Sequence, residues 1–317
     1  MKRSTASGFL LLLLLEACAS NKTNIDITKP LDTKEASNAA RAYERGMQEK
    51  KDQNTLEATR YFEAVRNSFP YSQYAALSEL ALADMRFDAD DYAFAATAYQ
   101  DFVKNHPSHA KADYAAFRVG LAHYQDRASD FFLFPPSYER DQTPVKAALD
   151  AFQKFVAAYP KSDFAVRARD LINDCRERLA AHDRYVAGFY WKRHAWRGAA
   201  GRLLELADAY GDLQDGRLRG DSLWRAAVAY YNAKDFTAER SVLTRLVQES
   251  PNDSHRKEAE TLLKTLPSGN APPQGTPAPQ PGAERPGEVP TAPPIERPES
   301  APKPGEPVGA PAPKPEK

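Results

Sequence analysis

The residues of this sequence that could carry out chemistry are two cysteines, six histidines and several pairs of carboxylates. His106 and His109 are three residues apart, but Pro107 lies between them and no cysteine is near, so the spacing does not match a zinc site. Asp208 and Asp212 are typical of a solvated helix surface, whereas a glycosidase needs two carboxylates that face a cleft from opposite sides. We therefore expect no catalytic residue, no metal site and no enzyme activity.

Cys18 ends a segment that has the layout of a secretion signal. The apolar stretch 9–15 follows two basic residues and is far shorter than the ~20 residues needed to cross a bilayer, so we expect a signal peptide over residues 1–17. Leu15-Glu16-Ala17-Cys18 resembles the lipobox of bacterial lipoproteins, in which the chain is cut before the cysteine and the cysteine is acylated. We expect a covalent lipid on Cys18 and no other cofactor. Ordinary secretion is the alternative.

The residues after Cys18 indicate where such an anchor would hold the protein. Ala19 and Ser20 follow the cysteine, and in lipoproteins of this kind the absence of aspartate there favours delivery to the outer membrane. We therefore expect an outer-membrane location on the periplasmic face, with the lipid as the contact to the membrane. Residues 18–35 are polar and show no periodic apolar face, which predicts a flexible tether.

Cys175 lies in a periodic apolar run with Leu171, Ile172 and Leu179. This pattern predicts a buried thiol rather than a nucleophile. Acylation of Cys18 would leave Cys175 without an intramolecular partner, so we expect no disulfide.

The composition separates a globular part from a tail. Of the 25 prolines, 17 lie between Pro267 and Lys317, and a segment of this kind cannot bury a core. We expect residues 267–317 to be disordered, to sample polyproline II and to act as a spacer; a ligand for a proline-binding groove and a cell-wall contact are the alternatives. The chain has 43 basic and 43 acidic residues, so no excess of positive charge favours a nucleic-acid partner.

One pattern occurs five times in the globular part. It consists of an alanine, a bulky apolar residue four positions later, another three after that, and a proline five further on. The fourth copy has glycine instead of proline, and the fifth has glutamate instead of alanine. The copies are Ala58, Phe62, Val65, Pro70; Ala95, Tyr99, Phe102, Pro107; Ala148, Phe152, Phe155, Pro160; Ala199, Leu203, Leu206, Gly211; and Glu239, Leu243, Leu246, Pro251.

Steps of four and three place these side chains on one face of a helix, and the proline ends that helix. Twelve residues before the first position, Gly46, Ala83, Ala187 and Ala227 supply the small residue of a preceding antiparallel helix. These are the marks of the tetratricopeptide helix-turn-helix unit, so we expect an all-α, right-handed solenoid of about five repeats that ends near Leu266. We place repeats 1–3 in residues 36–161, and a linking helix with repeats 4–5 in residues 162–266.

Two insertions interrupt the array. Residues 127–142 separate the helices of the third repeat and contain three phenylalanines and a tyrosine. This apolar loop either packs into the solenoid or contacts a partner. Thr143-Pro144 then predicts an N-cap and a first-turn proline. After Pro160, Ser162 is expected to cap a long helix that runs to about Ala181.

The repeats, the lipobox and the inserted loop together resemble the BamD family of outer-membrane β-barrel assembly lipoproteins. The most specific stretch includes Phe131-Phe132, Arg140-Asp141 and Tyr159-Pro160, and it is similar to that family's third repeat with its insertion. Further matches are Phe69-Pro70-Tyr71-Ser72-Gln73 and the segment from Tyr185 to Trp196. The resemblance extends over most of the chain outside the tail.

This resemblance implies a non-enzymatic subunit of the complex that folds and inserts β-barrel proteins into the outer membrane. Its N-terminal repeats would hold the C-terminal segment of an unfolded barrel protein. Core packing is the alternative role for each residue that we expect in this groove. The candidates are Tyr43, Phe69, Tyr71 and Tyr74.

The C-terminal repeats would dock on the periplasmic repeats of the barrel-forming subunit, and other assembly lipoproteins would be further partners. An arginine in such an interface can bind a partner carboxylate in bidentate fashion, and aromatic residues with arginine are common interface anchors. The docking candidates are Arg202, Trp196 and Arg193. For Arg202, an exposed helix charge of little energetic weight is the alternative.

Other tetratricopeptide lipoproteins of the envelope are the rival interpretation, such as a pilotin or a coordinator of cell division and cell-wall synthesis. The Phe-rich insertion with Arg140-Asp141 argues against them, because a simple array does not need it. Residues 19–35 contain no heptads, which argues against a division protein with an N-terminal coiled coil.

Overall fold

The computed structural model describes residues 38–129 and 133–266, and all the regular structure in these ranges is helical. The expected all-α fold is therefore confirmed. None of the helices in these ranges is both long enough and apolar enough to span a membrane. The elements are α2 (Ala39–Lys51), α3 (Thr55–Ser68), α4 (Gln73–Asp88), α5 (Tyr92–Asn105), α6 (Ala112–Gln125), the 3-10 helix η1 (Ser137–Glu139), α7 (Thr143–Ala158), α8 (Ala165–Lys192), α9 (Trp196–Tyr210), α10 (Arg217–Asn232), α11 (Phe236–Glu249) and α12 (Arg256–Thr265).

Several predictions concern residues outside these ranges. The signal peptide over residues 1–17, the lipid site Cys18, the tether over 18–35 and the tail over 267–317 all lie outside the described residues, as do Phe131 and Phe132 of the inserted loop.

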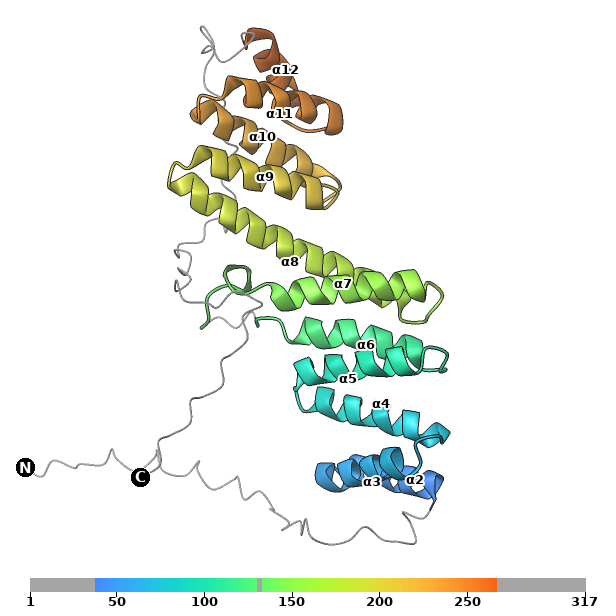
Figure 1. Ribbon diagram of the computed structural model, residues 1–317. Helices are drawn as coiled ribbons and strands as arrows, with labels where there is room; N and C mark the ends of the chain where they lie inside the picture. Colours follow the sequence, from blue (N-terminus) through green and yellow to red (C-terminus); the bar gives the residue numbers. More distant parts are fainter. Residues whose placement is uncertain (1–37, 130–132, 267–317) are drawn as a thin grey trace, which may run out of the picture. The chain divides into compact units, whose positions relative to one another are not determined.

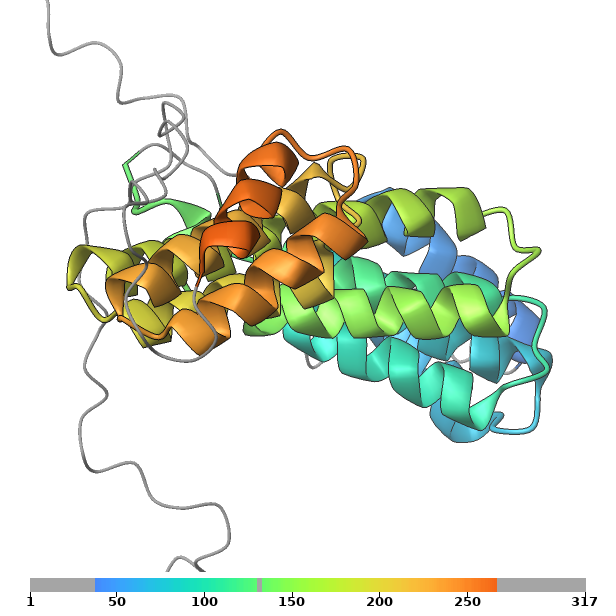
Figure 2. The same cartoon turned by 90° about the horizontal axis from the view of Figure 1, so that it is seen from above.

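The chain forms two compact units, Met1–Met85 and Arg86–Lys317, and the boundary falls within α4. In the first unit, α2 packs against α3. In the second, each helix from α5 to α12 packs against the next one in the sequence, and α8 is the longest of them (Figures 1 and 2). This connectivity is that of a helical solenoid.

The two helices of a repeat approach closely because a small residue on the first faces a large side chain on the second. A Cβ atom added to Gly46 of α2 would lie 2.8 Å from a ring carbon of Phe62 on α3, and one added to Gly120 of α6 would lie 2.5 Å from the ring of Phe152 on α7. Both bulky residues are buried in every copy of the repeated pattern, which confirms the pattern as the core. Gly120 was not predicted, because the insertion in the third repeat lengthens the usual twelve-residue separation between the small residue of the first helix and the alanine of the second.

In four of the five repeats the second helix ends where proline requires, and the fourth repeat has Gly211 at this place. Helices α3, α5, α7 and α11 end two residues before Pro70, Pro107, Pro160 and Pro251. Proline disfavours the helical conformation in the residue before it, so the helix stops there.

A shared turn joins the helices of four repeats. Gln53, Asp90, His194 and Lys234 each lie one residue before the N-cap of the second helix, and each has a φ between 56° and 62°. None of them is glycine, so the turn holds an L-residue in the left-handed region at some cost in stability. The third repeat has the insertion at this place instead.

Two predicted caps are wrong by one or two residues. Gln142, not Thr143, occupies the N-cap of α7, and the Asp141 carboxylate accepts hydrogen bonds from the Thr143 N–H at 2.9 Å and hydroxyl at 2.7 Å. Phe164, not Ser162, occupies the N-cap of α8, and the Ser162 hydroxyl donates to Asp113 at 2.7 Å.

The linking helix is also longer than predicted. It continues past Ala181 to Lys192, so it merges with the first helix of the fourth repeat into the 28-residue helix α8. Cys175 and Leu179 are buried on this helix, as expected.

The predicted end of the solenoid, near Leu266, coincides with the last residue that the structure describes and stays a prediction. α12 ends at Thr265 and Leu266 is buried. The ring of His255, just before α12, stacks on the fully buried Trp224 of α10 with centroids 4.7 Å apart. Ala259 and Leu262 of α12, the last helix in the described residues, join the same apolar cluster as Trp224.

Glu239 is the one position where the repeated alanine is replaced by a charged residue. Its side chain is only 1% exposed, and its Oε2 atom has no hydrogen-bond partner. Burial raises the pKa of Glu239 from 4.5 to about 7, opposed by the nearby Arg240. In the four other repeats an alanine at this position is completely buried.

We predict that Glu239→Gln removes a pH dependence of stability. The raised pKa favours the protonated carboxyl in the folded state, so its stabilising effect is complete below pH 4.5 and is lost as the pH rises through about 7. Between pH 5 and 8 the native protein should lose about 2–3 kcal/mol of unfolding free energy that the variant retains. Urea denaturation across this range measures it, with the exposed Glu258→Gln as control. Equal pH slopes in native protein and Glu239→Gln would contradict the assignment.

Candidate functional site

The four groove candidates all lie in the first unit, and the structure brings two of them together. The ring of Tyr43 on α2 lies 5.6 Å from that of Tyr74 on α4 and 5.7 Å from that of the buried Phe62. Tyr43 is half-buried, and this burial raises the pKa of its hydroxyl. Tyr43 and Tyr74 are both partly exposed, so they combine packing with an accessible edge.

The two other groove candidates differ from this pair in burial and in their contacts. Phe69 occupies the C-cap of α3 and is partly buried. Tyr71 is fully exposed, so core packing is excluded as its role. An exposed tyrosine beside a helix end is available to a partner, but no described contact joins Tyr71 to Tyr43.

The docking candidates Trp196 and Arg193 lie at the corner between α8 and α9. The ring of Trp196 is 5.3 Å from that of Trp191 and 5.0 Å from that of His194, the residue with positive φ in the turn. The Arg193 guanidinium lies over the ring of Phe189 at 4.0 Å. Both tryptophans are partly exposed and Arg193 is exposed, so the corner presents aromatic surface next to a cation.

The third docking candidate, Arg202, lies further along α9. Its Nη1 atom is 2.8 Å from Oε2 of Glu205 on the same helix, and its side chain is 42% exposed. An exposed pair at this spacing contributes little to stability, so Arg202 can exchange Glu205 for a partner's carboxylate at small cost. The charge of Arg202 also acts on the half-buried Asp183 of α8. Burial raises the pKa of Asp183 above its usual value, and the charges of His182 and Arg202 oppose this shift in part.

The inserted loop is fastened to α8 at its base. Gln142 is buried, and its Nε2 atom donates to the carbonyl oxygens of Ser137 at 2.7 Å and Arg140 at 2.8 Å. The Tyr138 carbonyl lies 2.7 Å from Nδ1 of His182 on α8, and the Tyr138 ring lies 5.8 Å from that of Tyr185. The base of the loop is therefore held in place by hydrogen bonds and ring packing.

The part of the loop near its tip is apolar and exposed. Leu133 is 72% exposed and Phe134 56% exposed, while Tyr138 packs on α8. Both interpretations of the loop therefore apply to different parts of it: the base packs into the solenoid and the described part of the tip is available for contact.

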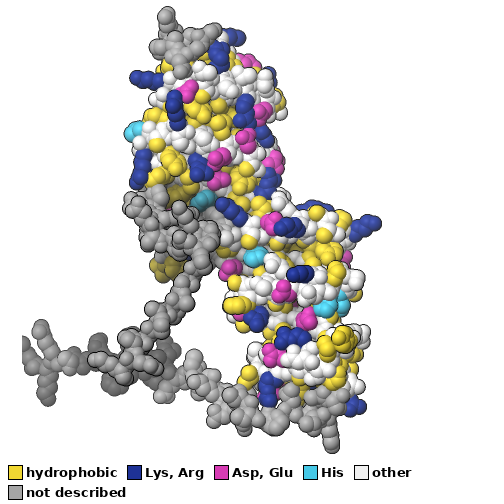
Figure 3. Space-filling model, in the orientation of Figure 1, with side chains coloured by type: hydrophobic (Ala, Val, Ile, Leu, Met, Phe, Trp, Pro, Cys, Tyr) yellow, Lys and Arg dark blue, Asp and Glu magenta, His cyan; other side chains and the backbone are white. Residues whose placement is uncertain are grey.

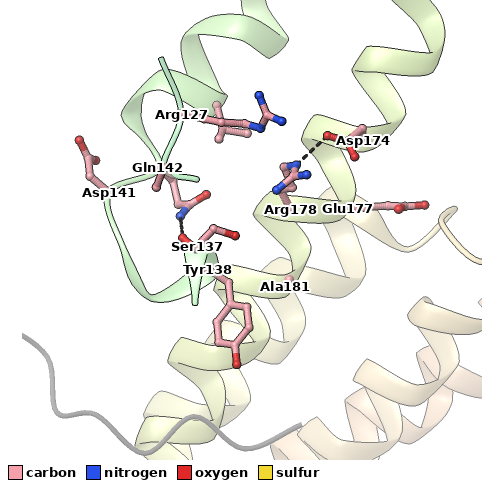
Figure 4. Close-up of a pocket in the computed structure, with 11 residues that line it drawn as sticks. Arg127, Ser137, Tyr138, Asp141, Gln142, Asp174, Glu177, Arg178 and Ala181 are labelled. Atoms are coloured by element: carbon pink, nitrogen blue, oxygen red, sulfur yellow. Dashed lines mark hydrogen bonds and ion pairs between the residues drawn. The ribbon is translucent and has the colours of Figure 1, made fainter. Parts of the chain in front are cut away.

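A pocket of about 280 Å³ lies between this loop and α8 (Figure 4). On the α8 side the Asp174 carboxylate accepts hydrogen bonds from Nε of Arg178 at 2.7 Å and from the hydroxyl of Tyr124 at 2.8 Å. Arg127, at the start of the loop, lies over the Tyr124 ring at 3.8 Å and lines the opposite wall. The pocket thus has a polar, mixed-charge lining.

Two residues of α8 and its C-cap, Arg193, form a line that was not predicted as a surface, although Arg193 alone was a docking candidate. Tyr185, Phe189 and Arg193 are spaced four apart, which places them on one helix face, and Tyr138 of the loop packs at the near end of this line. We call Tyr138, Tyr185, Phe189 and Arg193 the α8 stripe. The four-residue spacing was visible in the sequence, but the addition of Tyr138 depends on a contact across 47 positions of the chain.

The segment of the chain that carries most of the α8 stripe is rich in basic residues. Residues 184–204 contain five lysines and arginines and no aspartate or glutamate. Figure 3 shows dark-blue cationic and magenta acidic side chains interspersed among yellow hydrophobic ones over the second unit. Two of these cations pair with carboxylates on the surface, Arg202 with Glu205 at 2.8 Å and Arg197 with Asp235 at 3.1 Å. The surface thus combines partly exposed rings with paired charges.

The described residues offer little to covalent chemistry. Cys175 is completely buried, and burial raises the pKa of its thiol to about 12, so the thiol stays protonated at neutral pH. Within residues 38–129 and 133–266, no three histidine, cysteine or acidic side chains gather as metal ligands would. The arrangement is suited to binding.

Comparison with known proteins finds matches to most of the repeats. The model of the YfiO family, described as an outer membrane lipoprotein, matches residues 35–233, and a tetratricopeptide-repeat model matches residues 221–253, which contain most of α10 and α11. The first match includes the groove candidates, the inserted loop, the α8 stripe and Arg202.

Curated relatives carry the name outer membrane protein assembly factor BamD. The protein of Vibrio cholerae is 32% identical over 219 residues, which cover 68% of this chain and 87% of the relative. That of Pasteurella multocida is 29% identical over 161 residues, covering 50% and 62%, and that of Neisseria meningitidis serogroup A is 27% identical over 220 residues, covering 69% and 80%.

We predict that Gln142→Ala releases the inserted loop without unfolding the solenoid. The substitution removes the two hydrogen bonds that close the base of the loop, worth about 1 kcal/mol each. Hydrogen exchange of residues 126–142 should accelerate by roughly thirtyfold, the factor that corresponds to about 2 kcal/mol, while exchange in α10 stays unchanged. Gln153→Ala, an exposed position on α7, is the control. Unchanged exchange in the loop would show that Gln142 does not hold it.

Proposed function

The chain belongs to the YfiO family of outer membrane lipoproteins, and from this membership we propose that it is a subunit of the machinery that assembles β-barrel proteins in the outer membrane. The observation that carries the proposal is the family match over residues 35–233, because it includes the repeats together with the inserted loop and the α8–α9 corner. A match limited to generic repeats would not separate this role from that of other scaffold lipoproteins.

The lipid anchor belongs to the same proposal. Cleavage before Cys18 and acylation of its thiol would hold the protein on the periplasmic face of the outer membrane. A single acyl chain anchors only marginally, whereas several chains on one cysteine hold firmly. Residues 18–35 would then act as the tether between the lipid and the first repeat, which keeps the folded part within a few tens of ångströms of the membrane.

The first unit is the proposed site for unfolded barrel proteins. The accessible edges of Tyr43 and Tyr74, together with the exposed Tyr71, offer aromatic surface to an extended segment that ends in an aromatic residue. Such segments bind through apolar pockets for alternate side chains and polar groups for the backbone. Binding of this kind keeps the segment unpaired until it is handed over.

The α8–α9 corner is the proposed dock for the periplasmic repeats of the barrel-forming subunit. Trp196 and Arg193 supply an aromatic and cationic anchor, and Arg202 supplies a second cation whose present partner, Glu205, is solvent-exposed. Other assembly lipoproteins would bind the remaining surface. The protein acts by binding and positioning, without a chemical step of its own.

We predict that Arg202→Glu weakens capture of a barrel-forming outer-membrane protein with periplasmic repeats. The test is a pull-down of the native protein from detergent-solubilised membranes with identification of the co-purifying proteins. Reversing a charge that faces a carboxylate should reduce recovery about tenfold, equivalent to ~1.4 kcal/mol. Arg169→Glu, on an exposed turn of α8 far from the corner in sequence, is the matched control and should capture normally.

The same experiment examines the rival role. Recovery of pilus or cell-wall proteins without any barrel-forming protein would refute the assembly role and favour a different envelope scaffold. Equal recovery by Arg202→Glu and Arg169→Glu would leave the assembly role in place but remove Arg202 from the docking surface.

A further inference from the structure

The pocket between the inserted loop and α8 belongs to neither the proposed groove nor the proposed dock. Its volume of about 280 Å³ lies just below the roughly 300–1,000 Å³ of small-molecule sites, so it suits one side chain with its adjoining backbone better than a large ligand. The walls come from Val145 on α7, Ala181 on α8 and the base of the loop, which Gln142 closes. The pocket is therefore built from parts of the second unit that are already held in place.

Arg127 supplies a cation to this pocket. Its guanidinium lies over the Tyr124 ring at 3.8 Å, and this stacking helps to fix its position. Its Nη1 atom donates to the Tyr124 carbonyl oxygen at 2.5 Å and to Oε1 of Gln125 at 3.5 Å. Neither partner is a carboxylate, and both hydrogen bonds to described residues come from Nη1. The Nε and Nη2 donors of Arg127 can therefore bind a ligand.

The other charged residues of the lining do not neutralise Arg127. The Asp174 carboxylate pairs with Arg178, with Nε and Oδ2 2.7 Å apart. Figure 4 shows Arg127 directed into the space between the loop and α8, and Asp141 and Glu177 directed away from it. Arg127 is thus a cation that faces the pocket without a matching carboxylate among the described residues.

The loop wall of the pocket offers a hydrogen-bond acceptor. Gln142 is buried, and its Nε2 atom makes its side-chain hydrogen bonds, to the carbonyl oxygens of Ser137 and Arg140. Its Oε1 atom accepts no hydrogen bond from a described residue, and Figure 4 shows this oxygen on the side toward α8. An amide oxygen in this place is suited to an N–H donor of a ligand.

A carboxylate with an N–H group nearby matches both features. A guanidinium binds a carboxylate through two parallel N–H donors, and these charge-assisted hydrogen bonds are stronger than neutral ones. An acidic residue within a peptide carries both groups, the carboxylate on its side chain and the N–H on its backbone. Phosphate fits less well, because it has no N–H donor and Asp174 would repel it. A lysine side chain fits less well, because Arg127 would repel it.

We propose that this pocket binds a carboxylate group, which pairs with Arg127, while Oε1 of Gln142 accepts a hydrogen bond from an N–H of the same ligand. The carboxylate belongs either to an acidic side chain of a bound peptide segment or to a small free carboxylate. The proposal goes beyond the assembly role and does not rest on it, because it depends only on the residues that line the pocket.

Titration of the purified full-length protein in detergent tests the site by NMR. The probes are the peptides Ac-Ala-Glu-Ala-NH₂, Ac-Ala-Gln-Ala-NH₂ and Ac-Ala-Lys-Ala-NH₂, together with glutarate and inorganic phosphate. With isotope-labelled alanine methyl groups in the protein, the signals of Ala128 and Ala181 in the lining report the site, and that of Ala195 before α9 is the control. The Glu peptide should shift the two lining signals saturably and bind at least tenfold more tightly than the Gln or Lys peptide.

Variants of Arg127 locate the carboxylate. Arg127→Gln should weaken binding of the Glu peptide at least tenfold, and Arg127→Lys, which keeps the charge but loses the paired donors, should restore part of it. Arg169→Gln, at an exposed position near the start of α8, is the matched control and should bind like the native protein. A thermal melt checks that each variant is folded.

Glutarate separates the two sources of the carboxylate. If glutarate binds as tightly as the Glu peptide, the ligand is a small free carboxylate; if the Glu peptide binds more tightly, the ligand is an acidic residue of a bound segment. Absence of a saturable shift with either, or an Arg127→Gln variant that binds like the native protein, would overturn the proposal. Equal or tighter binding of the Gln peptide, the Lys peptide or phosphate would overturn it as well. No assembly partner is present, so such a failure leaves the proposed function in place.

Discussion

The close approach of the two helices within a repeat is the constraint on which the rest of the structure depends. Gly46 lies against the ring of Phe62 and Gly120 against the ring of Phe152, at distances that leave no room for a methyl group. A larger residue at either glycine would push the helix pair apart and open a gap beside a fully buried ring. Because each repeat in the second unit packs against the next, this spacing also determines where the outer faces of the helices lie.

We expect the binding surfaces to lie where the array departs from this regular packing of helix pairs. In four repeats a short turn with one residue at positive φ joins the helices, whereas the third repeat has the inserted loop. Gln142 closes the base of the loop by hydrogen bonds to Ser137 and Arg140, and Tyr138 attaches the loop to α8 through His182. Its attachment places Tyr138 beside Tyr185, so a loop and a long helix together form a surface that neither would form alone.

Features with a local cause could be predicted from the sequence, and features with a distant cause could not. Prolines ended the second helices as expected, because their effect acts on the preceding residue. The α8 boundary was missed because no glycine or proline separates Ala181 from Ala187, so nothing interrupts the helix. Ser162 lies two residues before the N-cap of α8, where its hydroxyl accepts a hydrogen bond from the Phe164 N–H at 3.3 Å and donates one to Asp113, 49 residues away. The contact with Asp113 and the packing of Tyr43 on Tyr74 depend on the tertiary structure, so the sequence could not predict them.

A role in β-barrel assembly is tested most directly by depleting the protein in its native host and measuring the abundance of folded outer-membrane β-barrel proteins. The account predicts a several-fold fall in folded barrels across unrelated families, with inner-membrane proteins unchanged and full rescue by the native chain expressed from a second copy. Unchanged barrel levels after complete depletion would contradict the assembly role.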